Sequence, residues 1–183
     1  MDAPLVARWR TALWCRHALP GLLLLAAALV YFLPVFQAAG MFAGSDIRQA
    51  FFYWHSFFRS EMLEFGRFPL WDPYTFGGRP FFAGLQPALL YPLTWLYLLP
   101  SYPLALHLNL MLNLAAAAFF AYLYIERVTG DRVAGLAAGI IYAFSGFALT
   151  RLMLGHVSIV NALPWLPLLF YGSERLHDGW RQG

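Results

Sequence analysis

Asp46 is the residue of this sequence best placed to do chemistry. It follows an apolar run that ends at Phe36 and precedes a stretch with helical spacing, so we expect it at the first turn of a helix beside a membrane surface. A carboxylate there can take a proton from an acceptor hydroxyl as a general base, or help to hold a divalent cation that binds phosphate. The alternative is a structural role, in which the charge complements the dipole at the helix N-terminus.

The run Pro69–Pro80, PLWDPYTFGGRP, carries a second pair of candidates. Its prolines and glycines predict turns, which would leave Asp72 and Arg79 on a constrained loop. Arg79 can bind phosphate oxygens through its fork of N–H donors. Asp72 fits either substrate binding or an ordinary turn-starting bond from its side chain to the backbone.

Arg151 and His156 flank the predicted turn between the last two apolar runs, on the same side of the membrane as Asp46. We expect them to close the site from above, because Gly155 lets the turn pack closely. An Arg at the boundary of a span can instead extend to the lipid headgroups. His55 lies nine residues after Asp46, about 180° around a helix, and so points away from it.

Other kinds of site lack support in the sequence. Cys15 is the single cysteine, so a zinc-type Cys/His cluster is excluded, and no residue is assigned as a metal ligand. A divalent cation near Asp46 is the one cofactor that stays open. Phosphate-loop, dinucleotide, zinc-hydrolase and serine-hydrolase motifs are absent. The enzyme classes that remain work inside or beside a membrane.

The composition points to lipid as the natural solvent of the chain. Of its 183 residues 61% are apolar and 11% are charged, against about 25% charged residues in soluble domains. A water-soluble monomer is therefore excluded. The net charge of +3 comes from twelve arginines, no lysine and nine acids. Because the arginines are spread along the chain, no nucleic-acid partner is predicted.

We predict an all-α polytopic membrane protein that forms a single membrane domain with about four transmembrane helices. Each helix needs roughly 20 apolar residues to cross about 30 Å of hydrocarbon. The predicted spans are residues 19–36, 104–125, 133–150 and 157–172, and a long outer loop, 37–103, follows the first. Gly135 and Gly139 form a face of small residues that predicts close packing of the third span.

The long outer loop is predicted to hold juxtamembrane helices. Ser45 is expected to cap a helix that runs from Asp46 to about Phe65. Its aromatic stripe suits a helix that lies flat in the headgroup region. The stripe consists of Phe51, Trp54, Phe58, Met62 and Phe65. Residues 85–100 are apolar but short and interrupted by prolines, so we expect a juxtamembrane or re-entrant segment rather than a span.

The distribution of arginine predicts a cytoplasmic N-terminus. Three arginines precede the first span, two lie in the predicted inner turn and two follow the last span. These seven of the twelve are Arg8, Arg10, Arg16, Arg127, Arg132, Arg175 and Arg181. A cleaved signal peptide is the alternative for the first apolar run, although the apolar region of such peptides is usually only about 7 to 15 residues long.

Three segments carry a resemblance to a known family. They are GSDIRQAFFYW at Gly44–Trp54, FPLWDPYTFGGRPFFAGLQPALLYPLTWL at Phe68–Leu96, and GHVSIVNALPWLPLLFYGSERL at Gly155–Leu176. Together they resemble bacterial YfhO-like membrane proteins, which belong to the GT-C class of polytopic glycosyltransferases. The resemblance extends from about residue 20 to residue 176.

The resemblance implies the N-terminal part of a GT-C-like fold in the bacterial inner (cytoplasmic) membrane. It further implies a membrane lipid environment, a polyprenyl-phosphate sugar donor and an envelope glycan, lipid or protein as acceptor. Asp46 matches the acid of the class's first outer loop. The matching substrate-binding candidates are Gln49, Asp72, Arg79, Arg151 and His156.

Two departures from the class pattern qualify this resemblance. Ile47 stands where many members have a second acid, so a mechanism without a metal fits at least as well. GT-C proteins are also considerably longer, so the chain is expected to be a fragment of a longer protein.

Two functions follow. The first is a membrane glycosyltransferase, or its N-terminal segment, in which Asp46 deprotonates or orients the acceptor hydroxyl while Arg79 or Arg151 stabilises the leaving lipid phosphate, with inversion at the anomeric carbon. The second is a non-catalytic membrane module that binds a lipid-linked glycan or a partner in envelope assembly. A transporter has the least support, because no charge pair lies in the middle of a span.

Overall fold

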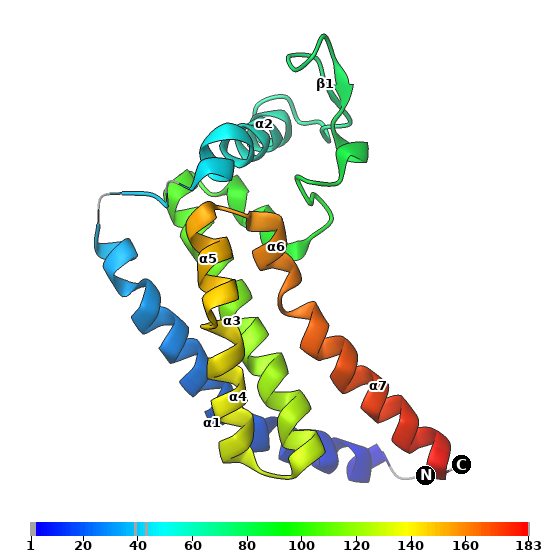
Figure 1. Ribbon diagram of the computed structural model, residues 1–183. Helices are drawn as coiled ribbons and strands as arrows, with labels where there is room; N and C mark the ends of the chain where they lie inside the picture. The colour runs from blue at the N-terminus through cyan, green and yellow to red at the C-terminus, as the bar shows by residue number, and fades with distance from the viewer. Residues whose placement is uncertain (1–2, 39, 43, 183) are drawn as a thin grey trace.

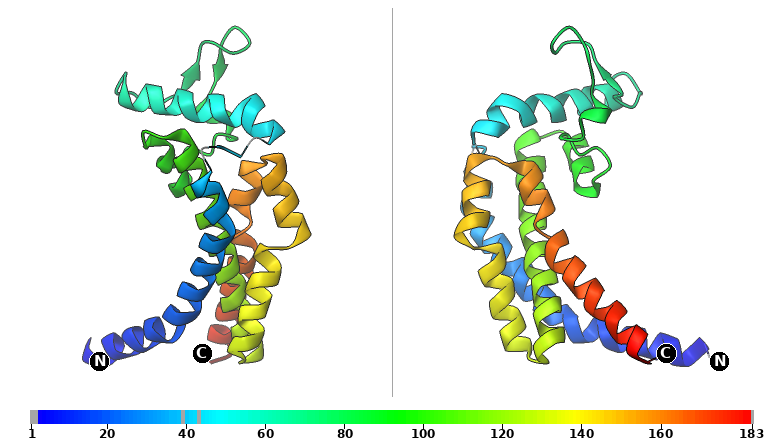
Figure 2. Two further views of the ribbon diagram at one scale, coloured as in Figure 1. Left: turned by 90° about the vertical axis from the view of Figure 1, so that its left-hand side faces the viewer. Right: turned by 45° about the vertical axis from the view of Figure 1, so that its right-hand side comes forward.

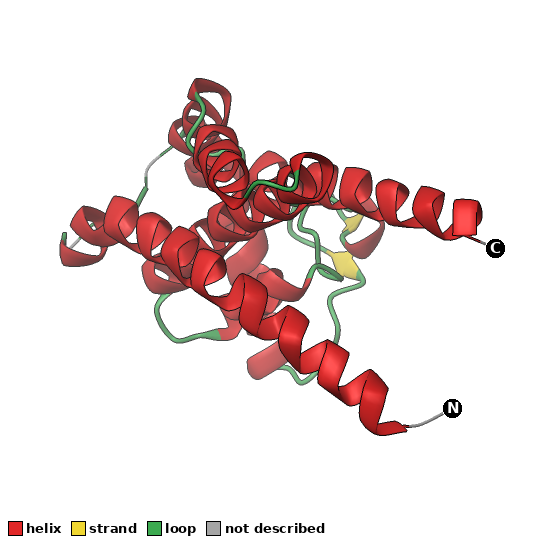
Figure 3. Cartoon of the chain, turned by 90° about the horizontal axis from the view of Figure 1, so that it is seen from below, coloured by secondary structure: helices red, strands yellow, loops and turns green. Residues whose placement is uncertain are grey.

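The computed structural model describes residues 3–38, 40–42 and 44–182. Helices of very different length form the body of an elongated molecule (Figure 1). They are α1 (Ala3–Gln37), α3 (Tyr102–Thr129), α4 (Arg132–Ala143), α5 (Gly146–Leu154), α6 (Val157–Ala162) and α7 (Trp165–Gln182). Both chain ends lie at one end of the bundle, and the loop between α1 and α3 covers the other. Seen from below, the first part of α1 and the last part of α7 extend away from the bundle (Figure 3).

Within the described residues, three helical segments are long and apolar enough to cross a membrane. They are Arg16–Gln37, Tyr102–Thr129 and Arg132–Leu154. These segments fit the predicted all-α membrane architecture and coincide with its first three predicted spans, each a few residues longer than predicted. α3 is the most buried of the three and packs against α1, α4 and α7, so it forms the centre of the bundle.

Two predicted spans are broken rather than continuous. The third, predicted over 133–150, is α4 followed by α5, and the hydroxyl of Ser145 caps α5 by accepting from the backbone N–H of Ala148 at 3.3 Å. The fourth, predicted as one span over 157–172, is instead α6 and α7, separated next to Pro164, which cannot donate a helix hydrogen bond. α7 becomes polar from Ser173 onward and so lacks a long apolar window. It still runs back beside α3 (Figures 1 and 2).

The small residues of α4 set its distance from α3, as predicted. A Cβ added to Gly139 would lie 2.5 Å from the backbone oxygen of Ala118, and one added to Gly135 would lie 2.8 Å from the Tyr122 ring. Neither space admits a side chain. In lipid, where apolar contact alone does not drive helices together, this close backbone approach is what holds α3 and α4 side by side.

The helix after Asp46 forms as predicted, but its start differs. A π-helical turn, Ile47–Phe51, leads into α2 (Phe52–Leu63), which lies across the end of the bundle (Figure 2). Ser45 was predicted to cap this helix but does not. Its hydroxyl donates to Asp46 Oδ1 and to the backbone oxygen of Leu154, both at 3.3 Å.

Most of the aromatic stripe of α2 packs against protein. Phe58 is buried and meets the Trp95 ring edge-to-face, 5.7 Å between centroids, whereas Phe65 is exposed. Trp95 belongs to a 3₁₀ helix, Pro92–Leu98. This short helix confirms that residues 85–100 form no spanning helix, because the prolines limit the segment to one irregular stretch beneath α2.

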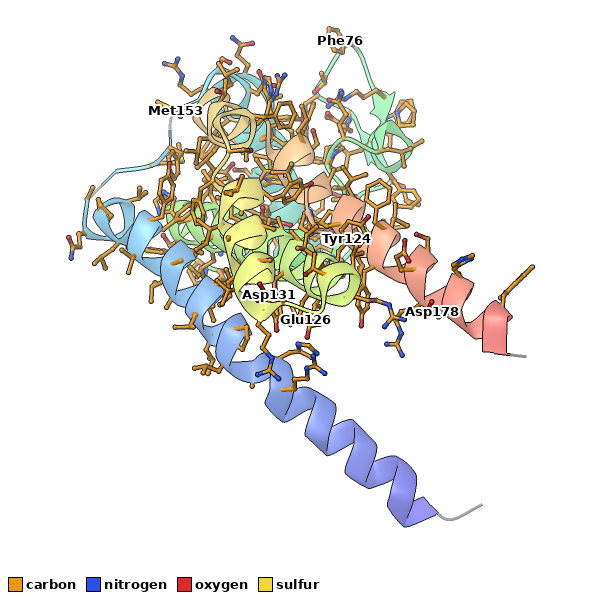
Figure 4. All side chains as sticks on the ribbon, turned by 60° about the horizontal axis from the view of Figure 1, so that its bottom comes forward. Phe76, Tyr124, Glu126, Asp131, Met153 and Asp178 are labelled. Carbon is orange, nitrogen blue, oxygen red and sulfur yellow. The ribbon has the colours of Figure 1, made fainter. Side chains whose placement is uncertain are left out.

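A two-stranded hairpin completes the outer loop. β1 (Trp71–Asp72) pairs antiparallel with β2 (Arg79–Pro80), and Asp72 stands opposite Arg79. A short 3₁₀ helix, Phe82–Gly84, follows. The hairpin tip carries Phe76 at the far end of the molecule from Glu126 and Asp131, which lie at the α3–α4 turn (Figure 4). The hairpin therefore projects away from the spanning helices.

The α3–α4 contact gives a direct test of the packing. Gly139→Val should lower the free energy of unfolding by about 1–3 kcal/mol, because the new side chain overlaps the backbone of α3. Thermal unfolding of the protein in detergent measures the change. Ala137→Val, on the exposed face of the same helix, is the control and should leave stability unchanged. Equal effects of the two substitutions would contradict the assignment.

Candidate functional site

Two glycines bring the first outer loop against the α5–α6 turn. A Cβ added to Gly44 would lie 2.4 Å from the backbone nitrogen of Gly155, and one added to Gly155 would lie 2.9 Å from Ile47 Cγ1. Gly155 also has a φ of +81°, a conformation that glycine adopts without strain. The two backbones are therefore in direct contact, and this contact brings Asp46 and His156 together.

Asp46, His156 and Arg151 form a chain of polar contacts at the end of the bundle opposite the α3–α4 turn. His156 Nε2 lies 3.4 Å from Asp46 Oδ2, and His156 Nδ1 lies 3.1 Å from an Nη of Arg151. Arginine can only donate, so Nδ1 accepts and the proton of the neutral imidazole lies on Nε2, the ring nitrogen nearer Asp46. Arg151 thus fixes the tautomer of His156, and His156 lies beside the Asp46 carboxylate. The sequence predicted that these three residues share one side of the membrane, and the structure brings them into contact.

Asp46 opens onto a small cavity of about 170 Å³. Its side chain is 44% exposed, so the carboxylate keeps acceptor positions that no protein group occupies. The wall combines aromatic, amide, imidazole and hydroxyl groups. The lining residues are Asp46, Ala50, Phe51, Trp54, Gln86, His156, Ser158 and Ile159.

Asp72 lies apart from this cavity and anchors the hairpin. It is fully buried and accepts from the Thr75 hydroxyl at 2.6 Å, the Tyr53 hydroxyl at 2.7 Å and the backbone N–H of Tyr74 at 3.0 Å. Burial disfavours its charged form, but these hydrogen bonds outweigh burial and hold the pKa of Asp72 below its usual range. Of the two roles open to Asp72 in the sequence, these contacts match the turn-forming one.

Arg79 lines a second cavity, of about 270 Å³. Its Nε donates to Asp72 at 3.4 Å, and its guanidinium lies 5.6 Å from the centroid of the Trp54 ring. The two cavities share Trp54 and Gln86, so they are adjoining parts of one groove. The second cavity is lined by Trp54, Arg79, Pro80, Phe81, Gly84, Gln86 and Pro87.

The groove gathers some of the predicted site residues and leaves others outside. Asp46, His156 and Arg79 line it, and Arg151 reaches it through His156. Gln49 is exposed and lines neither cavity.

Sequence reasoning missed Gln86 and Ser158, and it assigned Trp54 only to the aromatic stripe of a helix lying in the headgroup region. The signal for Gln86 was weak, a lone amide among prolines and apolar residues. Its place in the groove depends on how the loop folds.

A buried amide cluster behind the groove was also missed. The Asn113 amide donates to Asn161 Oδ1 at 2.8 Å and to the backbone oxygen of Asn109 at 2.9 Å, and Asn113 Oδ1 accepts from the Tyr91 hydroxyl. The cluster links α3, α6 and the outer loop. Asparagine at i and i+4 in an apolar span was a readable signal, since polar side chains within spans pair with one another.

The described residues bring no three His, Cys, Asp or Glu side chains together as metal ligands. Asp46 and His156 are the two such side chains that line the groove, where a divalent cation would also need oxygen ligands from water or a bound phosphate.

The fold and composition define an α-helical membrane protein with a polar groove at one end of its bundle. No family model, no curated protein and no solved structure matches the chain.

His55 lies outside the groove, as predicted. It is buried, stacked on Tyr97 with 3.6 Å between ring centroids, and its Nδ1 has no hydrogen-bond partner among the described residues. Burial lowers the pKa of His55 from 6.5 to about 3. The folded protein thus holds this imidazole neutral at a pH where the unfolded chain would protonate it.

The low pKa of His55 predicts a pH dependence of stability. The free energy of unfolding keeps its full value above about pH 6.5. Below that pH it falls by about 1.4 kcal/mol per pH unit, because only the unfolded state takes up the proton on His55. His55→Phe keeps the stacking but cannot be protonated. Between pH 7 and pH 5 the free energy of unfolding of this variant should therefore fall by about 2 kcal/mol less than that of the unmodified protein. Chemical denaturation in detergent at both pH values measures it. The same pH dependence in protein and variant would contradict the assignment.

Proposed function

We propose that the groove is the outer-face site of a membrane glycosyltransferase that uses a sugar linked to a polyprenyl phosphate. The observation that carries the proposal is the convergence of Asp46, His156 and Arg79 on one groove at the end of an apolar bundle. A lipid phosphate at the membrane surface would lie at this level. The resemblance to YfhO-like proteins supports the same substrate class.

Asp46 is the proposed general base. It would take the proton of the acceptor hydroxyl while the acceptor oxygen bonds to the anomeric carbon. The bond from that carbon to the phosphate oxygen breaks, the lipid phosphate leaves with the bonding electrons, and the configuration inverts. His156, whose Nε2 lies 3.4 Å from Asp46 Oδ2, would keep the carboxylate oriented toward the hydroxyl.

Arg79 is the better placed of the two candidate arginines to receive the leaving phosphate. Arg151 is engaged with His156 and lies over the Phe147 ring, 5.0 Å from its centroid. Arg79 lines the cavity, and its bond to Asp72 uses Nε alone, which leaves both Nη groups as donors. A guanidinium can bind two phosphate oxygens at once.

We further propose that the groove faces the outside of the bacterial inner membrane. Arg16, Arg127 and Arg132 lie at the end of the bundle that holds both chain ends, opposite the groove. The positive-inside rule assigns that end to the cytoplasm. Arg8, Arg10 and Arg181 fall outside the residues whose side chains are described.

Replacement of the proposed base tests the function. Asp46→Asn should lower sugar transfer from a polyprenyl-phosphate-linked donor by about 100-fold or more, because an amide cannot accept the proton. The assay follows release of polyprenyl phosphate by membranes that contain the protein. Folded yield in detergent should be unchanged.

The matched control is Asp131→Asn, at the opposite end of the bundle. Asp131 caps α4 by accepting from the backbone N–H of Val133 at 2.8 Å, and asparagine caps equally well. Its transfer rate should equal that of the unmodified protein. Transfer retained by Asp46→Asn rules out Asp46 as the base. Lipid-phosphate binding that depends on Arg79, without transfer by any form, favours the non-catalytic module.

The orientation has its own test. Cys15→Ser removes the single cysteine, after which Arg48→Cys and Arg132→Cys, both at exposed positions, report on opposite ends. A membrane-impermeant maleimide should label Arg48→Cys on intact cells, and Arg132→Cys only after permeabilisation. The reverse pattern would overturn the proposed orientation.

A further inference from the structure

We propose that the second cavity binds a pyranose ring, with Trp54 and Gln86 as its sugar-contacting residues. This inference rests on the proposed function and assigns a substrate-binding role to two residues to which the resemblance gives no role. The ring would belong either to the lipid-linked donor or to a glycan acceptor, and the experiment below separates these sources.

The groups on the cavity wall match the two faces of a sugar. The indole of Trp54 offers an aromatic surface for ring C–H groups, while Gln86 and Arg79 offer amide and guanidinium groups for hydroxyls. The remaining wall is apolar or backbone. A volume of about 270 Å³ lies just below the range of about 300–1,000 Å³ typical of drug-sized ligands, so the cavity suits one small ring.

Strained backbone holds Gln86 in place. Among the described residues, Phe76, Leu85 and Ala88 are the non-glycine positions with positive φ, and two of them bracket Gln86. Leu85 has φ 55° and Ala88 has φ 52°, conformations that cost each residue of order 1–3 kcal/mol. Such strain persists only where the surroundings impose it. Here it positions an exposed amide at the junction of two cavities, a typical arrangement for a binding site.

The opposite wall of the cavity is equally fixed. Asp72 holds Arg79 from behind, and buried Phe81 packs edge-to-face on Phe57 with 4.8 Å between centroids. Trp54 is held by an edge-to-face contact with Phe51 at 5.1 Å. Rigid walls lower the entropy lost when a ligand binds.

The shared residues place the proposed sugar next to the proposed base. Trp54 and Gln86 line both cavities, so a ring held between them faces the cavity of Asp46 and His156 on one side and Arg79 on the other. This order, base, ring and guanidinium, is what displacement at the anomeric carbon requires, because the acceptor and the leaving phosphate lie on opposite sides of that carbon.

Binding measurements on the detergent-solubilised protein test the inference. The probes are bare polyprenyl phosphate, the same lipid bearing glucose, N-acetylglucosamine or mannose, and the free disaccharides of these sugars. At least one sugar-bearing lipid should bind about tenfold more tightly than the bare lipid. Trp54→Ala should remove most of this gain in affinity. Gln86→Ala should lower the affinity for the sugar-bearing lipid about 3- to 10-fold. Gln86→Ala should not alter the affinity for the bare lipid, because it leaves the contact between Trp54 and Arg79 intact.

Phe52→Ala serves as the matched control. It removes an exposed aromatic side chain from the same helix as Trp54, and Phe52 lines neither cavity. This variant should bind every probe as the unmodified protein does.

The pattern of binding shows whether the ring belongs to the donor or the acceptor, and it tests the sugar subsite and the glycosyltransferase function separately. Dependence on Trp54 and Gln86 seen with the sugar-bearing lipid assigns the cavity to the donor, and dependence seen with a free disaccharide alone assigns it to the acceptor. Disaccharide binding that needs these residues, without any lipid binding, supports the sugar subsite and overturns the proposed function. If no sugar probe depends on either residue, the inference is wrong, even where bare lipid binds.

Discussion

The backbone contact between Gly44 and Gly155 is the constraint on which the site depends. Asp46 and His156 are far apart in sequence, and no side chain could bridge the outer loop to the α5–α6 turn unless the two backbones met. With a Cβ on Gly44 only 2.4 Å from the Gly155 nitrogen, any other residue would push them apart. The polar chain from Arg151 to Asp46 therefore depends on two residues that have no side chains.

A cluster of buried amides fixes the two parts of the groove relative to each other. Lipid gives little apolar driving force for helix association, so polar contacts and close packing must specify the arrangement. Asn113 is hydrogen-bonded to Asn161 on α6, the helix that begins directly after His156. It is also hydrogen-bonded to Tyr91, on the loop that carries Gln86. One asparagine thus relates both walls of the groove to the central helix α3.

The sequence predicts those parts of the structure that depend on local pattern. The apolar runs, the small-residue face of Gly135 and Gly139 and the helix after Asp46 follow from composition and spacing, and all three appear. The interruptions next to Ser145 and Pro164 were missed, although both residue types mark helix boundaries, because the apolar runs continue through them. The groove could not be read from sequence, because Trp54 and Gln86 meet only through tertiary folding.

Two carboxylates of the outer loop show how burial separates structural from chemical roles. Asp46 and Asp72 both lie in the loop between α1 and α3, and sequence alone leaves both roles open for each. Asp72 is fully buried, with its oxygens occupied by hydroxyl and backbone donors that hold its pKa low. It has no acceptor position to offer a substrate. Asp46 is 44% exposed, and among the described residues its polar side-chain contacts are with Ser45 and His156, so it is the carboxylate that can bind an incoming hydroxyl.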